Sequence, residues 1–115
     1  LIESSAKKGS FLKAVSRETG AANAEIVTSR IEDVHNLYEP HIITARALAA
    51  LDVLFDYALP MTQHAAFEKA LFFKGRQFED EINTAKQRYR FEYKCHQSIV
   101  AEDSHILEIA DLTCA

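Results

Sequence analysis

The order of apolar and polar positions along the chain predicts strands that alternate with helices. Apolar residues return every three or four positions in three segments, which is the spacing of one helix face. The predicted helices cover residues 6–19, 48–59 and 77–87. Runs rich in β-branched and aromatic residues predict strands at residues 1–3, 25–28, 41–44, 70–73, 90–97 and 104–112, and a polar turn or short helix is expected at 30–38.

Local signals mark where the helices begin and end. Ser4 or Ser5 can cap the first predicted helix, and Gly20 is expected to end it. Pro60 is expected to end the second. The apolar stripe of the first helix consists of Phe11, Leu12 and Val15.

The order of these elements predicts an α/β fold. Alternating strands and helices favour a parallel sheet with helices on both faces. The last two strands follow each other directly, which indicates an antiparallel pair at one edge. With 115 residues, of which 48% are hydrophobic, the chain has the size and core of a single domain, residues 1–115.

Composition narrows the classes of function. A formal net charge of −4 argues against a dedicated basic nucleic-acid binder but allows a local basic patch. No apolar stretch reaches membrane-spanning length and no signal peptide opens the chain, so a cytoplasmic protein is expected. Cys95 and Cys114 are expected to be free thiols, and the five histidines lack metal-ligand spacing, so no metal is expected.

Several polar residues fall where predicted strands end. Glu3 ends the first strand, Ile31 and Glu32 follow the second, and Arg46 follows the third. Open α/β sheets bind ligands beyond these carboxyl ends, and a carboxylate there can accept both hydroxyls of a ribose. The alternatives are a solvated charge or helix-dipole partner for Glu3, a plain turn at 31–32, and a structural ion pair for Arg46.

Cations gather at two places in the sequence. Lys74 and Arg76 flank a glycine after the fourth predicted strand, and Lys7 and Lys8 open the first helix. Together these side chains could contact phosphates. The alternative is an ordinary solvated face.

Five motifs in order resemble the bacterial ribosomal RNA small-subunit methyltransferase G family, also called glucose-inhibited division protein B. They are LIES at 1–4 with KKGSFL at 7–12, SRIED at 29–33, ITARALA at 43–49, FFKG at 72–75 and ILEI at 106–109. The alanine-arginine-alanine step within ITARALA is the most specific of them. The motifs extend over essentially the whole chain.

The resemblance implies a Rossmann-like class I methyltransferase fold whose seven strands lie in the order 3-2-1-4-5-7-6. It implies S-adenosylmethionine as cofactor and methylation of a guanine ring nitrogen, giving 7-methylguanosine, in RNA of the small ribosomal subunit. Glu3 would then hold the ribose, Ile31 and Glu32 the adenine side, and Arg46 the methionine or substrate end. The cations Lys7, Lys8, Lys74 and Arg76 would lie near the RNA. No catalytic residue is identified.

One part of the family pattern has no match in this sequence. The family's first strand and the glycine-rich loop after it are absent, so the chain is expected to be a partial, C-terminal portion of the domain. Without this central strand we expect two half-sheets whose open edges favour self-association. We also expect weak cofactor binding and no activity from the isolated chain.

Two other classes of function remain open. The first is a degenerate, non-catalytic binding or regulatory module on the same scaffold. The second is a nucleotide-dependent oxidoreductase, which shares the acidic strand end but would need the dinucleotide fingerprint that this sequence lacks.

Overall fold

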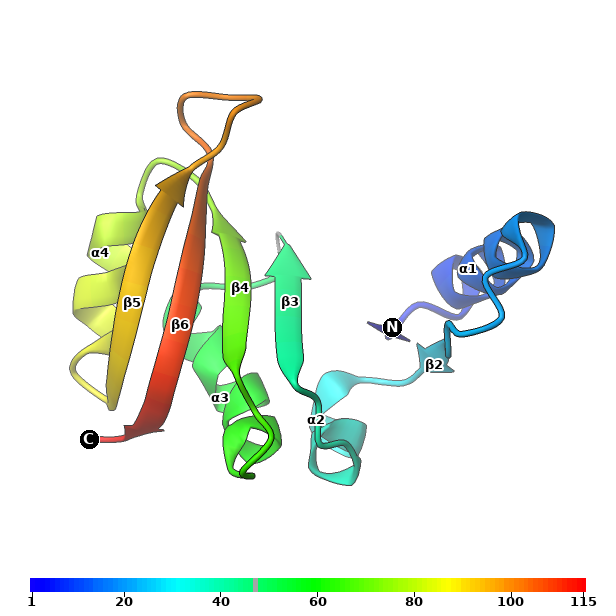
Figure 1. Ribbon diagram of the computed structural model, residues 1–115, viewed down its shortest axis with the longest axis horizontal. Coiled ribbons are helices and arrows are strands. Elements are labelled where there is room, and N and C mark those ends of the chain that lie inside the picture. Colours follow the sequence, from blue (N-terminus) through cyan, green and yellow to red (C-terminus); the bar gives the residue numbers. More distant parts are fainter. Residues whose placement is uncertain (47) are drawn as a thin grey trace. The chain divides into compact units, whose positions relative to one another are not determined.

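A computed structural model describes residues 1–46 and 48–115 and divides the chain into two units, Leu1–Leu37 and Tyr38–Ala115 (Figure 1). Ala47, the last residue of the predicted alanine-arginine-alanine step, lies outside the described residues. No helix in the described ranges is long and apolar enough to cross a membrane.

The first unit is built on a short parallel strand pair. Strands β1 (Ile2–Glu3) and β2 (Val27–Thr28) pair in register, and helix α1 (Ala6–Thr19) connects them. The short helix α2 (Ile31–Val34) and the 3₁₀ turn η1 (His35–Leu37) follow. The predicted helix and the predicted short helical turn are thus confirmed.

Both predicted ends of α1 are confirmed in atomic detail. The hydroxyl Oγ of Ser5 accepts a hydrogen bond of 3.2 Å from the backbone N–H of Lys8. This bond satisfies one of the N–H groups that a helix start leaves open. Gly20 takes the left-handed conformation, with φ 69°, and its N–H bonds back to the last turn. Glycine adopts this conformation without steric cost.

Helix α1 packs against β2 through a face that the apolar pattern did not indicate. Gly9 is its buried residue, and a Cβ at this position would lie 2.3 Å from Oγ1 of Thr28. The expected core stripe is instead largely open, with Phe11 66% and Val15 39% exposed. A pair of two-residue strands offers too little surface to cover that stripe.

The second unit contains a four-stranded sheet in the order β3-β4-β6-β5. Strand β3 (Ile42–Arg46) runs parallel to β4 (Lys69–Lys74), whereas β6 (His105–Cys114) is antiparallel to both β4 and β5 (Tyr89–Gln97). The antiparallel pair predicted for the last two strands is confirmed. The order β3-β4-β6-β5 matches the last four strands, 4-5-7-6, of the seven-stranded order that the resemblance implies.

Helices α3 (Leu51–Thr62) and α4 (Phe78–Ala85) cover one face of this sheet (Figure 1). Buried residues from both helices and from β4, β5 and β6 form one core cluster. At its centre, the ring of Phe55 lies 4.8 Å from that of Phe91 and 5.4 Å from that of Tyr89, centroid to centroid. Helices were expected on both faces of one sheet, but within Tyr38–Ala115 these two share a face.

Helix α3 differs from its prediction at both ends. Leu48 lies outside the helix and is 58% exposed, and the helix continues past Pro60 to Thr62. Proline has no backbone N–H, so the helix loses the one internal hydrogen bond that residue 60 would donate. Tertiary contacts hold this last turn: Met61 and Thr62 are buried, and Nε2 of Gln63 donates to the carbonyl of Leu112 at 3.2 Å.

Candidate functional site

The first unit brings two of the predicted site segments together. Glu3 ends β1 and pairs with Thr28, the last residue of β2. The N–H of Ser29 donates to the carbonyl of Glu3 at 3.0 Å. The turn that carries Ile31 and Glu32 therefore begins beside Glu3, at the carboxyl end of both strands, where open α/β sheets bind ligands.

Two carboxylates lie at this end of the strand pair. The side chain of Glu3 is 27% exposed, and its Oε1 is 4.0 Å from Nζ of Lys8. Oε2 of Glu32 accepts a 3.1 Å bond from Nε of Arg30. A backbone hydrogen bond at Glu32, together with the Arg30 guanidinium, lowers the pKa of the Glu32 carboxyl. An ionised carboxylate accepts hydrogen bonds and donates none.

This arrangement offers acceptors and an apolar side chain at one end of the strand pair. The Lys8 contact is longer than a hydrogen bond, which leaves the oxygens of Glu3 able to accept from a pair of ribose hydroxyls. Ile31 is partly exposed at the start of α2 and offers an apolar side chain to a base. The chemistry of these groups is therefore that of a site that could hold the ribose and base of a nucleoside.

In the second unit, Arg46 is the last residue of β3, whereas the predicted strand ended at residue 44 and Arg46 followed it. It pairs with Phe73 across the parallel ladder, and its guanidinium carbon lies 5.9 Å from the centre of the Phe73 ring. The side chain is exposed, and among the described residues no acid lies within ion-pair distance of it. This geometry favours a guanidinium that can bind a ligand over a buried structural ion pair.

The two cations after β4 have different surroundings. The side chain of Lys74 is only 8% exposed, and its Nζ contacts the carbonyl of Ala49 at 2.5 Å and Oε1 of Glu81 at 2.9 Å. Arg76 is 78% exposed and pairs with the exposed Asp103. The geometry favours a structural role for Lys74 over contact with RNA, and leaves Arg76 at the surface.

Sequence reasoning missed Glu81. Its Oε1 also accepts a 2.9 Å bond from the N–H of Leu51, the first residue of α3. One signal was present in the sequence: α3 follows Ala49 and Ala50, neither of which has a capping side chain. A helix that starts without a local cap needs an acceptor from elsewhere in the fold.

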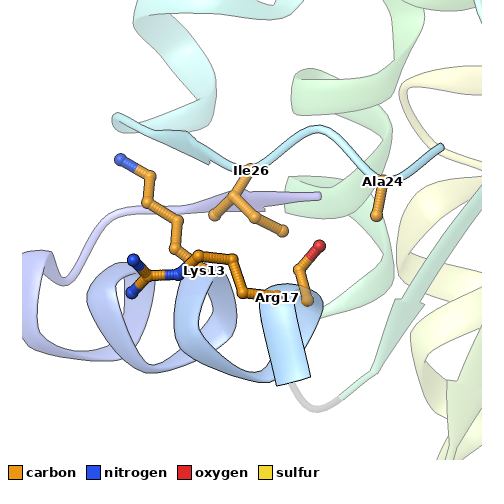
Figure 2. Close-up of a pocket in the computed structure, with 5 residues that line it drawn as sticks. Lys13, Arg17, Ala24 and Ile26 are labelled. Atoms are coloured by element: carbon orange, nitrogen blue, oxygen red, sulfur yellow. The ribbon is translucent and has the colours of Figure 1, made fainter. Parts of the chain in front are cut away.

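A shallow hollow of about 410 Å³ lies elsewhere in the first unit, between the second half of α1 and the segment that enters β2 (Figure 2). Lys13 and Arg17 leave α1 beside Ile26, and Ser16 and Ala24 complete the lining. The hollow lies at the amino end of β2, whereas Glu3 and Thr28 lie at the carboxyl ends of the strands. It is therefore separate from the candidate site.

Comparison with known proteins gives one consistent result. A family model described as rRNA small subunit methyltransferase G matches residues 1–109. Proteins named ribosomal RNA small subunit methyltransferase G are similar over nearly the whole chain. The one from Allorhizobium ampelinum is 41% identical over 113 residues, which are 97% of this chain and 53% of the relative.

Two further relatives of the same name give similar values. The protein from Rhizobium leguminosarum bv. trifolii is 42% identical over 113 residues, which are 97% of this chain and 55% of the relative. The protein from Dinoroseobacter shibae is 40% identical over 110 residues, 96% of this chain and 54% of the relative. The chain thus spans about half the length of the curated relatives that it matches.

Proposed function

The chain belongs to the rRNA small subunit methyltransferase G family, and from this membership we propose that the protein methylates N7 of a guanine in small-subunit ribosomal RNA, with S-adenosylmethionine as methyl donor. The observation that carries the proposal is the family match over residues 1–109. Because the chain spans about half of each relative, the activity is proposed for the protein at its full natural length.

The first unit is proposed to hold the adenosine part of the cofactor. The carboxylate of Glu3 accepts from the two ribose hydroxyls, because its oxygens are not engaged in a hydrogen bond with Lys8. Ile31 and Glu32 lie on the adenine side, next to Glu3 through the Ser29 hydrogen bond. The bound cofactor supplies an electrophilic methyl group.

The proposed reaction does not require a base from this chain. Guanine N7 carries a lone pair and no proton, so no proton has to be removed before the nitrogen accepts a methyl group. The residues of this chain then contribute by binding and orientation, which can supply a large part of a rate enhancement. This is consistent with a site whose candidate residues are acceptors and cations rather than an acid–base pair.

Arg46 is proposed to hold an anionic group, either the carboxylate of the cofactor or a phosphate of the RNA. Its planar fork can donate two parallel hydrogen bonds to such a group, and stacking on Phe73 limits the orientations of the guanidinium.

RNA phosphates are proposed to contact the exposed cations Lys7, Lys8 and Arg76. The ion pair between Arg76 and Asp103 is exposed on both sides, and such surface pairs contribute little to stability. Exchange of Asp103 for a phosphate therefore costs little. With a small ribosomal subunit as its substrate, the protein is proposed to act in the cytoplasm.

The test is methylation of small ribosomal subunits by the protein at its full natural length, with labelled cofactor and mapping of the labelled base. Arg46→Lys keeps the charge and loses the fork, so we expect a fall in methyl transfer on the order of tenfold or more. The matched control is Arg90→Lys, at an exposed arginine of β5, which should retain wild-type activity.

Thermal unfolding is measured on the same variants. A melting temperature of Arg46→Lys within a few degrees of wild type, with activity lost, supports a binding role. Full activity in Arg46→Lys removes this residue from the site. A wild-type protein that labels no base, or labels a position other than guanine N7, refutes the proposed function.

A further inference from the structure

Helix α3 begins without a cap of its own. Its N-cap residue is Ala50, whose side chain cannot accept a hydrogen bond. Asp52 in the first turn is directed toward Arg88, with Oδ2 3.4 Å from the guanidinium. The N–H of Leu51 nevertheless has a partner, because Oε1 of Glu81 accepts from it at 2.9 Å. Glu81 comes from α4, thirty residues further along the chain.

The same carboxylate oxygen also binds a nearly buried cation. Nζ of Lys74 lies 2.9 Å from Oε1 of Glu81, and it donates to the carbonyl of Ala49 as well. Burial of an ammonium is costly unless it is paired and hydrogen-bonded. Lys74 meets both conditions here, so the positions of Glu81 and of the Ala49 carbonyl depend on each other.

These contacts act on Ala49 and Leu51, which follow the end of β3 at Arg46 within a few residues. Strand β4 holds Arg46 through its register partner Phe73, and the next residue of β4, Lys74, holds Ala49. Glu81 then holds Leu51. Ala49 is thus tied to β4 through Lys74, and Leu51 is tied to α4 through Glu81, while the β3–β4 ladder holds Arg46 itself.

We propose that Glu81 is a positioning residue of the methyltransferase site: it caps α3 from a distance, anchors Lys74, and through both contacts fixes the strand end that presents Arg46. The inference rests on the proposed function for its effect on methyl transfer. The capping contact itself is independent of that function.

The first experiment measures hydrogen exchange at the amide of Leu51 in the 115-residue chain. Glu81→Ala removes the acceptor, and exchange at Leu51 should rise by roughly fivefold or more. Glu81→Gln keeps an oxygen that can accept, so its exchange should remain closer to wild type. The control is Glu79→Gln, at an exposed carboxylate in the first turn of α4, and should leave Leu51 unchanged.

The second experiment measures kcat and KM in the protein at its full natural length, for cofactor and for ribosomal subunits separately. Glu81→Gln should raise the KM of the ligand that Arg46 binds by on the order of tenfold, because Lys74 loses its charged partner. A merely structural role would reduce the folded fraction and leave KM unchanged. In an Arg46→Lys background, Glu81→Gln should raise this KM little further, because the effects of changing two interacting residues are not additive.

The outcomes separate the two proposals. Unchanged Leu51 exchange in Glu81→Ala overturns the capping role. Equal effects of Glu81→Gln with and without Arg46→Lys overturn the positioning role. Absence of methyl transfer in the wild-type protein overturns the proposed function, and the exchange experiment still decides whether Glu81 caps α3.

Discussion

Replacement of Gly9 by alanine should destabilise α1, although the same change in an open helix stabilises it. A Cβ at Gly9 would lie 2.3 Å from Oγ1 of Thr28, and 3.3 Å from Cβ and Cγ2 of the same residue. Ordinary contact distances require a separation of roughly 3.5 Å. One way to relieve this clash is a shift of α1 away from β2 by about 1 Å. The other is rotation of the Thr28 side chain so that its Cβ hydrogen faces the new methyl group, and that contact is still tight.

The expected magnitude follows from two opposing effects. Alanine in a helix interior is favoured over glycine by about 1 kcal/mol. Overpacking of a close contact typically costs about 1–3 kcal/mol. The net change should therefore be a loss of about 1 kcal/mol in the stability of the first unit, opposite in sign to the effect of helix propensity alone.

Hydrogen-exchange mass spectrometry on peptides from α1 measures this local stability. Ser10→Ala serves as the control, because Ser10 is an exposed neighbour on the same helix and its change should slow exchange slightly. The double variant Gly9→Ala with Thr28→Ala removes Oγ1 and Cγ2 and should recover most of the loss. Slower exchange in Gly9→Ala alone would refute the close packing of α1 on β2.

Two further predictions concern the core of the second unit. Phe55→Ala should lower the free energy of unfolding by about 3–5 kcal/mol in urea titrations, because the ring is fully buried. The control is the same change at Phe11, which is 66% exposed and should cost less than about 0.5 kcal/mol. A loss below about 1.5 kcal/mol at Phe55 would contradict the described core. Burial, and to a smaller extent the hydrogen bond to Asp56, raises the pKa of Tyr89 from 10.0 to about 12. The neutral phenol therefore stabilises the fold fully below pH 10.0, and this stabilisation is lost as the pH rises toward about 12. Between these values the unfolding free energy of wild type should fall more steeply than that of Tyr89→Phe, and parallel pH profiles would count against the buried phenol.

The local features of this chain could be predicted from its sequence. The bounds of α1, its Ser5 cap and its Gly20 end depend on interactions within a few residues, and these are readable in order along the chain. The antiparallel pair of the last two strands follows from their direct succession. The proximity of Glu3 to the turn at 29–32 follows from the rule that the carboxyl ends of parallel strands lie at the same edge of a sheet.

Other features were decided only by tertiary structure. Pro60 stays helical because Met61 and Thr62 are buried, which no local pattern shows. Lys74 looks in the sequence like a surface cation, yet it is nearly buried beside Glu81. A cap or counter-charge supplied from a distant element depends on which elements pack together. Sequence periodicity records which face of a helix is apolar, but only the packed structure determines which neighbour that helix meets.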